Sequence, residues 1–399
     1  MDQVMLSQLE EIVPDMIVKE DLVSVKPVST EQVAAVMKWA HQANRTISTR
    51  DSDPASHVHL DLSNMGEIEE VDGDNFVAIV QSGINLEVFR SKIKEQEFNF
   101  PLIALGDRGL DLERAVSNDI TGPTTAKFGK WREFVLGMEL VLSTGKVIKV
   151  GGKNIKNVSG MDIIGLATGS GGDLGVITKL WLRLLPVPEG KLTMVARFTS
   201  MAEASRAASA LTEEGLIPNK AEVVSGQIAK EMGFSVQDNE ALVLILVEGF
   251  KNSLKRQMTA MEMEFVKRGT IGTQLYEKAE EVESLWEKYY LVVEELDRKD
   301  KYLLTVLPSR LSQLVSGVEK VLLDSKVKGD FISHGTVAKL NVYVDESKPL
   351  VETQIGKIVS SLGGRMDGRK IGVESHINEI EALERGLVHV FNSSSPLSV

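Results

Sequence analysis

The stretch that decides the fold is GGKNIKNVSGMDIIGLATGSGGDLGVIT, residues 151–178. Glycine recurs in it far more densely than chance, at positions 151, 152, 160, 165, 169, 171, 172 and 175. Glycine is needed where the backbone takes a positive φ or approaches a ligand closely, because it has no Cβ. The run predicts either a ligand-binding loop or a set of glycine-rich turns between strands, and spacing alone leaves both open.

The residues around this stretch predict an α+β module. MELVL (138–142) and KVIKV (146–150), joined by Ser-Thr-Gly, are typical of a β-hairpin leading into it. Further upstream, Ser29 and Gln32 form a capping box that predicts the start of a helix. Short strands are expected in the segments ISTR (47–50), HVHLDL (57–62) and FVAIVQ (76–81).

A second block begins after LLPVPEG (184–190), whose two prolines and glycine mark a domain boundary. Beyond it strands and helices alternate regularly, which favours a ferredoxin-like arrangement on an antiparallel sheet. The segment NVYVD (341–345) alternates as an edge strand would, and a long polar helix is expected over 276–297. No repeat of fixed period is visible.

Composition excludes several classes of function. The 45 Lys and Arg residues against 57 Asp and Glu give a net charge of −12, which argues against nucleic acid and anionic membrane surfaces as partners. The absence of cysteine rules out disulfides, cysteine-ligated iron–sulfur clusters and thiolate chemistry. There is no signal-peptide pattern and no run of 18 apolar residues. We expect a cytoplasmic protein that meets a membrane only through a partner.

Residues 122–188 resemble the FAD-linked oxidases of the glycolate oxidase and D-lactate dehydrogenase type, which have the vanillyl-alcohol oxidase (PCMH-type) fold. The shared pattern includes Gly-Pro at 122–123, Phe-Gly at 128–129 and an Arg-x-x-VLG strand from Arg132. It continues through KNVSGMD (156–162) and GSGGDLGVIT (169–178) into a strand that ends in LRLLPVP. The resemblance is good over residues 25–190 and thin beyond them.

The resemblance implies the domain organisation and the cofactor. Residues 1–190 would form a PCMH-type FAD-binding module of two α+β subdomains, and 191–375 a ferredoxin-like α+β cap. Residues 376–399 would form a helix and tail that return to the FAD module. The FAD-binding positions carried over from the family are Gly122, Pro123, Gly169, Ser170, Gly172, Gly175, Val176 and Ile177.

Lys156 and Asp162 also match the family pattern. For this pair, a local salt bridge or loop anchor and a cofactor contact both remain open.

Both phosphate-binding loops of the family depart from its pattern here. The first loop is a glycine run after a strand, whereas DSDPASHVHLDL follows Arg50 here. Asp51 and Asp53 would repel a pyrophosphate, because two unit charges about 4 Å apart interact by about 4 kcal/mol at intermediate dielectric. The second loop has Glu113-Arg114 in place of its glycine pair. Side-chain charge could substitute for backbone amides at Arg50, Arg108 and Arg114.

The substrate side departs as well. The family's Trp-x-x-Arg on a cap helix becomes LWEKYY, with Tyr289 at the arginine position and Lys288 beside it. The family's paired metal-binding histidines become His334 and Asn341, so we expect no metal site. The candidate catalytic residues are Lys288, Tyr289 and His334, and for His334 a solvated or core role is also open.

Two other features invite a site interpretation. His57 and His59 alternate on one strand face without a third ligand nearby, and a structural role is expected for them. The aromatic cluster of Trp286, Tyr289 and Tyr290 is expected to pack a helix.

The sequence predicts a subunit of an FAD-linked 2-hydroxy-acid dehydrogenase or oxidase, acting on a substrate such as glycolate or D-lactate. Electrons would pass to a partner, either a catalytic flavoprotein or an iron–sulfur subunit, in a hetero-oligomeric complex. One alternative is a catalytically degenerate, even flavin-free, structural subunit of such a complex. A further alternative is an FAD-dependent enzyme of different specificity with rearranged loops.

Overall fold

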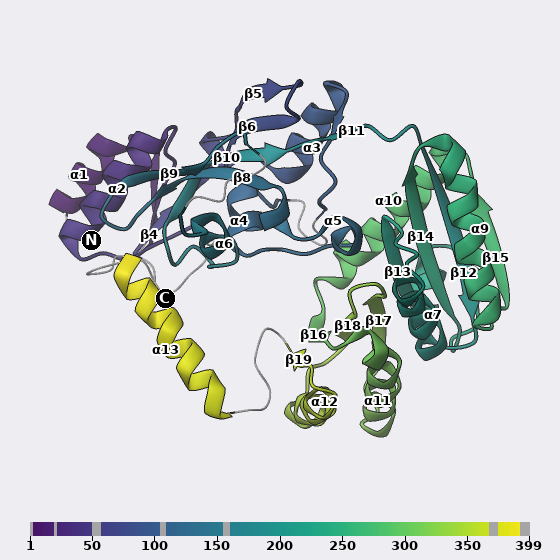
Figure 1. Cartoon of the computed structure of the whole chain (residues 1–399). Helices are drawn as coiled ribbons and strands as arrows, with labels where there is room; N and C mark the ends of the chain where they lie inside the picture. Colours follow the sequence, from purple (N-terminus) through teal and green to yellow (C-terminus); the bar gives the residue numbers. More distant parts are fainter. Residues whose placement is uncertain are drawn as a thin grey trace. The chain divides into compact units, whose positions relative to one another are not determined.

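The computed structural model describes residues 3–19, 22–49, 57–103, 109–154, 160–366 and 374–391. Contacts divide the chain into two compact units (Figure 1). Unit 1 comprises Met1–Thr121, Lys130–Val187 and Asn378–Val399, and unit 2 comprises Gly122–Gly129 and Pro188–Ile377. The division after Val187 lies within the proline-containing segment 184–190. The sequence did not indicate that 122–129 would belong to the second unit.

The first part of unit 1 is a four-stranded sheet of order β1-β2-β4-β3. Ser29 caps its main helix, accepting a hydrogen bond from the Gln32 amide, and the Gln32 side chain accepts one from the Val28 amide at 2.8 Å. The Ser29 cap of the predicted capping box is confirmed, whereas the Gln32 side chain reaches back to the residue before the cap instead of to Ser29 itself. The elements are α1 (Gln3–Ile12), β1 (Met16–Lys19), β2 (Leu22–Val25), α2 (Thr30–Ala43), β3 (Ile47–Ser48), β4 (Val58–Leu60) and the 3-10 helix η1 (Leu62–Asn64).

The second part of unit 1 is an antiparallel sheet of order β5-β6-β10-β8-β9. The predicted hairpin is confirmed as β8 and β9, and residues 151–178 connect the edge strand β9 to the central strand β10. The elements are β5 (Ile68–Asp72), β6 (Val77–Gln81), α3 (Leu86–Glu95), β7 (Phe98–Asn99), α4 (Leu112–Ser117), η2 (Trp131–Glu133), β8 (Val135–Val141), β9 (Val147–Gly151), α6 (Ile163–Ala167), β10 (Val176–Arg183) and β11 (Leu185–Pro186).

Unit 2 is built on one eight-stranded antiparallel sheet of order β15-β12-β14-β13-β17-β18-β16-β19. Its elements are α5 (Thr125–Phe128), β12 (Gly190–Phe198), α7 (Met201–Glu213), β13 (Lys220–Ser225), α8 (Gly226–Glu231), β14 (Ala241–Gly249), α9 (Lys251–Lys267), β15 (Gly272–Tyr276), α10 (Ala279–Leu296), β16 (Asp300–Thr305), η3 (Pro308–Arg310), α11 (Leu311–Asp324), β17 (Gly329–His334), β18 (Lys339–Val344), α12 (Pro349–Ser361) and β19 (Arg365–Met366). The last described helix of the chain, α13, spans Glu374–Phe391.

The eight strands form two ferredoxin-like halves. In chain order the strands of each half are β12, β13, β14, β15 and β16, β17, β18, β19, and both sets pair in the spatial order 4-1-3-2. The halves meet where β13 pairs with β17. The repeat has no fixed period, because α8 is inserted between β13 and β14 of the first half only. The expectation of an edge strand at NVYVD was wrong, since β18 lies between β17 and β16. Its alternation arises because only one face of the sheet packs against the main core.

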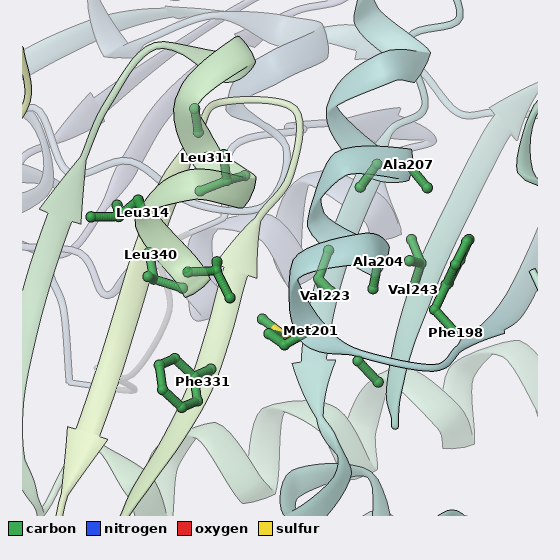
Figure 2. Close-up of a cluster of buried hydrophobic side chains, with 14 of the residues drawn as sticks. Phe198, Met201, Ala204, Ala207, Val223, Val243, Leu311, Leu314, Phe331 and Leu340 are labelled. Carbon is green, nitrogen blue, oxygen red and sulfur yellow. The ribbon is translucent and has the colours of Figure 1, made fainter. Parts of the chain in front are cut away.

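One continuous core joins the two halves on the face covered by α7, α9, α11 and α12. Figure 2 shows side chains of both halves, from Phe198 and Val243 in the first to Phe331 and Leu340 in the second. Side chains alternate between the faces of a strand, so the residues of β13 next to Val223 point to the opposite face. Helix α10 packs on that opposite face, where the Trp286 indole donates to the Thr193 hydroxyl at 3.0 Å.

Candidate functional site

Unit 1 contains a cavity of about 480 Å³ beside α4. Its walls come from Thr49 just after β3, the segment from β4 into η1 with Gly66 (59–66), the turn at 83–85 with Val88 of α3, and the residues from Gly109 into the start of α4. Segments that are far apart in sequence therefore converge here. The ionisable residues among the described lining are His59, Asp61, Asp111, Glu113 and Arg114.

Helix α4 begins with backbone amides that already have protein acceptors. The Leu112 amide donates to the Ile84 carbonyl at 3.0 Å, and the Glu113 amide to the Ser82 carbonyl at 2.8 Å. The Arg114 amide donates to the Asp111 side chain, the helix cap, at 2.7 Å. The backbone amides that a helix start can otherwise donate to a bound anion therefore donate to protein oxygens in the first turn of α4.

The glycine loop 169–175 packs against the other end of α4. The amides of Gly169 and Gly171 donate to the carbonyls of Val116 and Ser117 at 3.1 and 2.7 Å. Gly172 has a φ of +87°, and a Cβ placed on it would have no neighbour closer than the Thr49 hydroxyl at 3.9 Å. Its backbone therefore faces open space beside the end of β3, as a ligand cradle requires.

Gly175 is a glycine for a different reason. Its φ is +148°, and a Cβ there would lie 2.6 Å from the Val141 carbonyl oxygen. Only glycine allows β10 to start this close to β8.

The remaining cofactor residues carried over from the family fall into different surroundings. Ser170 donates its hydroxyl to the Ala167 carbonyl at 2.9 Å, and the side chains of Val176 and Ile177 are buried at the start of β10. Gly122 and Pro123 are buried in unit 2, where the Gly122 amide donates to Thr125 Oγ1 at 3.0 Å. Arg50, Arg108 and Lys156 lie outside the described residues. For all the residues of this paragraph, a contact with FAD stays a prediction.

Asp162 is a loop anchor in the structure. Its Oδ1 accepts from the Gly165 amide at 2.7 Å and caps α6, while its Oδ2 accepts from Arg132 Nη2 at 3.0 Å. Of the two interpretations of the family's Lys–Asp pair, the structure shows the anchor for Asp162.

Asp162→Ala is expected to lower the free energy of unfolding of unit 1 by about 1 kcal/mol, because it removes a helix N-cap. Arg132→Ala keeps the cap and removes only an exposed ion pair, so we expect a smaller loss, below about 1 kcal/mol. Urea unfolding of both variants measures the difference. Equal losses in the two variants would show that the cap contributes nothing.

In unit 2, two of the three candidate catalytic residues, Tyr289 and His334, both contact the side chain of Glu222. Glu222 is fully buried, and its Oε2 accepts from the Tyr289 hydroxyl at 2.7 Å and lies 2.7 Å from His334 Nδ1. The pairing of β13 with β17 places Glu222 directly opposite His334. Burial, and next the Glu222 charge, raises the pKa of the Tyr289 phenol well above its usual value, so it stays a donor.

The neighbouring lysines lie in contrasting places. Lys220 is buried, donates to the Tyr290 hydroxyl at 2.7 Å and lies 4.6 Å from the centre of the Trp286 ring. The aromatic cluster therefore packs α10 on the sheet. Lys288 is exposed and lines a separate cavity of about 530 Å³ with Phe234 and Tyr276. Lys288 and Tyr289 thus point to different sides of α10.

The two strand histidines have separate partners. His57 Nδ1 lies 2.7 Å from the Thr46 hydroxyl, and His59 Nδ1 lies 3.2 Å from the Ser24 hydroxyl. The described part of the chain contains no group of three or more histidine, cysteine or acidic side chains placed to hold a metal ion. Within the same residues, no helix combines the length and the apolar character that crossing a membrane requires.

The residues beside α4 fit FAD in part. The open backbone at Gly172 suits close approach of a cofactor, and the cavity that its neighbour Thr49 lines is large enough for a phosphate-bearing group. At the start of α4 only side chains could contact the cofactor, because the backbone amides there already donate to protein oxygens. Among the described residues that line the cavity, Arg114 is the one with a full positive charge.

Two family matches cover most of the chain. Residues 22–151 match the FAD binding domain, and residues 187–366 match the C-terminal domain of FAD linked oxidases. The first match spans the cavity, α4 and β9, and the second spans most of unit 2. The two domains occur here in one chain, so the FAD cofactor and the α+β fold follow from the family.

Two curated relatives are named for D-lactate and for glycolate. The chain is 30% identical over 247 residues to a D-lactate dehydrogenase of Archaeoglobus fulgidus, covering 58% of this chain and 55% of that one. It is 29% identical over 234 residues to glycolate oxidase subunit GlcD of Bacillus subtilis, covering 57% and 49%. The chain thus spans about half the length of the curated relatives it matches.

A solved structure of alkyldihydroxyacetonephosphate synthase shares the fold. It superposes with a TM-score of 0.74 at 17% identity, covering 94% of this chain and 76% of the other. At this identity the likeness supports the architecture of both units and nothing about the reaction.

Proposed function

Because the chain belongs to the FAD-linked oxidase family, we propose that it acts as a subunit of an FAD-linked 2-hydroxy-acid dehydrogenase or oxidase. Its substrate is of the glycolate or D-lactate kind, and it passes electrons to a partner protein. The names of the two curated relatives support this choice of substrate class.

The observation that carries the proposal is the convergence beside α4. The glycine loop 169–175 packs against the last residues of α4, and Gly172 lies beside Thr49 after β3. Thr49 also lines the cavity at the start of α4, and all of these segments belong to the unit that contains the FAD binding domain match. When bound, FAD supplies a two-electron acceptor for the hydride that leaves a CH–OH carbon. The chain's own contribution is to hold the cofactor at this loop, where Gly172 leaves its backbone open to close approach.

Composition is the support for a partner. The chain has no cysteine, so a cysteine-ligated iron–sulfur relay would have to reside in another subunit. We infer a hetero-oligomeric complex in which a catalytic flavoprotein or an iron–sulfur subunit receives the electrons.

Anaerobic mixing with substrate tests the proposal. The FAD-loaded chain is expected to lose its oxidised-flavin absorption on addition of D-lactate or glycolate. Propionate and acetate, which lack the hydroxyl to be oxidised, should leave the absorption unchanged. If dithionite bleaches the flavin but neither hydroxy acid does, the proposed substrate class is wrong.

A second candidate function is a catalytically degenerate, flavin-free structural subunit of such a complex. It is favoured by Glu113, whose carboxylate is buried at a position where the family has glycine, and by the occupied amides of α4. The two functions separate on flavin content: a folded chain that takes up no FAD at micromolar cofactor would support the structural subunit.

A further inference from the structure

We propose that the edge strand β15 of unit 2 is an interface at which two copies of this chain pair, strand against strand and antiparallel, about a twofold axis. The pairing needs no bound flavin, so it goes beyond the proposed function. Three features lead to it: an edge strand without the usual protection, apolar side chains exposed beside it, and charges of opposite sign at its two ends.

β15 lies at one end of the eight-stranded sheet, where it pairs with β12 (Figure 1). On its other side, no strand pairs with it among the residues that the structure describes. In an antiparallel ladder alternate residues direct their amides and carbonyls away from the neighbouring strand. The free side of β15 therefore presents backbone groups that a further strand can bond.

The other edge strands of the described sheets are protected against such pairing. Natural edges are kept single by charged residues, prolines, bulges or very short length. Among the edge strands of four or more residues, β1 carries Lys19, β5 (IEEVD) three carboxylates and β9 Lys149. The strands β3, β7, β11 and β19 have two residues each. β15 (GTQLY, 272–276) has five residues, no charge, no proline and an unbroken register with β12.

Large apolar side chains are exposed along this edge. Leu275 is directly opposite Met194, whose side chain is part of the core. Directly opposite residues share a face of the sheet, so Leu275 lies on the core face. Leu275 is nevertheless 44% exposed, and Ile271, just before the strand, is 51% exposed. At the edge, therefore, the core face continues into solvent.

Helix α9 extends this apolar surface. Thr273 Oγ1 donates to Glu262 of α9 at 2.5 Å, which holds the helix beside β15. Met263 and Val266, within one turn of Glu262, are 59% and 64% exposed. Exposed apolar groups that gather in this way mark interaction surfaces. On the opposite face, Gln274 lines the cavity of about 530 Å³, which leaves room there for side chains of a second strand.

The charges at the ends of β15 favour a second copy as the occupant. Before the strand, Lys267 and Arg268 share the single carboxylate of Glu264, so these ion-paired groups have an excess positive charge. After the strand, Glu280 is exposed and has no ion pair with a described residue, while the other carboxylates of 277–281 each pair with a lysine. A twofold axis places the positive end of each copy beside the negative end of the other.

Sedimentation velocity of the full chain without flavin tests the interface. The unaltered chain is expected to form a dimer at micromolar concentration. Leu275→Lys is expected to raise the dissociation constant about a hundredfold or more, because each copy loses an apolar contact and gains a charge within the apolar surface. Leu303→Lys is the matched control: Leu303 is 41% exposed, on the strand β16, which has a neighbour on both sides. It should leave the dimer unchanged.

Glu280→Lys alters no residue of the strand, so it serves if Leu275→Lys does not fold. It should weaken the dimer about threefold or more, since the charge contact occurs twice. A monomeric unaltered chain would overturn the proposal, whatever other protein binds β15. So would a dimer that folded Leu275→Lys leaves intact, or one that Leu303→Lys weakens equally.

A single cysteine tests the antiparallel geometry, because the chain has none of its own. When all five residues of β15 pair with those of the second copy, Gln274 lies opposite the same residue of that copy. Opposite residues have Cα atoms about 4.5–5.5 Å apart, within reach of a disulfide. Gln274→Cys should therefore give a disulfide-linked dimer on mild oxidation, whereas Gln313→Cys, at an exposed glutamine of α11, should not. A dimer that Gln274→Cys does not cross-link would overturn this pairing. Neither experiment involves flavin, so the proposed function stands or fails separately.

Discussion

Glu222→Ala is expected to lower the free energy of unfolding of unit 2 by about 3–5 kcal/mol. Glu222 is fully buried between β14 and β17, and its Oε2 is the partner of both the Tyr289 hydroxyl and His334 Nδ1. Removing it leaves two buried polar groups without their acceptor. It also removes a link between the two ferredoxin-like halves, and one between the sheet and α10.

Tyr289→Phe is the graded control. It removes one hydrogen bond to Glu222 and keeps the ring contact with Trp286, whose centre lies 5.5 Å away. The expected loss is about 1–3 kcal/mol. Amide hydrogen exchange of peptides from β13 and α10 measures both variants within unit 2. A loss below about 1 kcal/mol for Glu222→Ala would show that this network does not hold the halves together.

Gly172→Val is expected to weaken FAD binding by about a hundredfold or more, which corresponds to about 2.7 kcal/mol. The φ of +87° is strained for any residue with a Cβ, and most of all for a β-branched one. The new side chain would also project into the open space beside Thr49 that we assign to the cofactor.

Gly215→Val separates the two causes. Gly215 has a φ of +71° with no atom near the position of a Cβ, and it lies in unit 2 after α7. The Gly215→Val variant introduces similar backbone strain, so the free energy of unfolding should fall while the affinity for FAD stays unchanged. If both variants bind FAD as well as the unaltered chain, the loop 169–175 does not contact the cofactor.

Local signals made much of unit 1 predictable. The helix cap at Ser29 and the hairpin around Gly145 depend on residues within a few positions of one another, and both formed as expected. The glycine run predicted a loop whose backbone takes positive φ, and the structure places several such glycines there. That the ligand of this loop is FAD came from the family resemblance, because glycine spacing alone does not identify a ligand.

Features that depend on distant pairing could not be predicted. Glu222 stands in an otherwise apolar strand, and only the register between β13 and β17 reveals His334 as its partner. The sequence did indicate that Glu222 needs a partner, since a carboxylate in a buried strand must be hydrogen-bonded. It did not indicate which residue that partner is. The adjacent residues Lys288 and Tyr289 looked like one candidate site, yet helical geometry places them on different sides of α10.

The same limit applies to the boundaries of the units. Residues 122–129 precede η2 in sequence but belong to unit 2, where Lys127 Nζ donates to Asn219 Oδ1 at 2.7 Å. Burial lowers the pKa of the Lys127 ammonium, which is consistent with an enclosed position. The duplicated ferredoxin-like arrangement was hidden because the two halves have different insertions.

The flavin content of the chain tests the central claim most directly. The chain is purified, incubated with excess FAD, freed of unbound cofactor by gel filtration, and its visible spectrum is compared with its protein concentration. We predict close to one FAD per chain, released on denaturation. A folded, colourless chain after this treatment would contradict the claim that the loop 169–175 and the cavity beside α4 hold FAD.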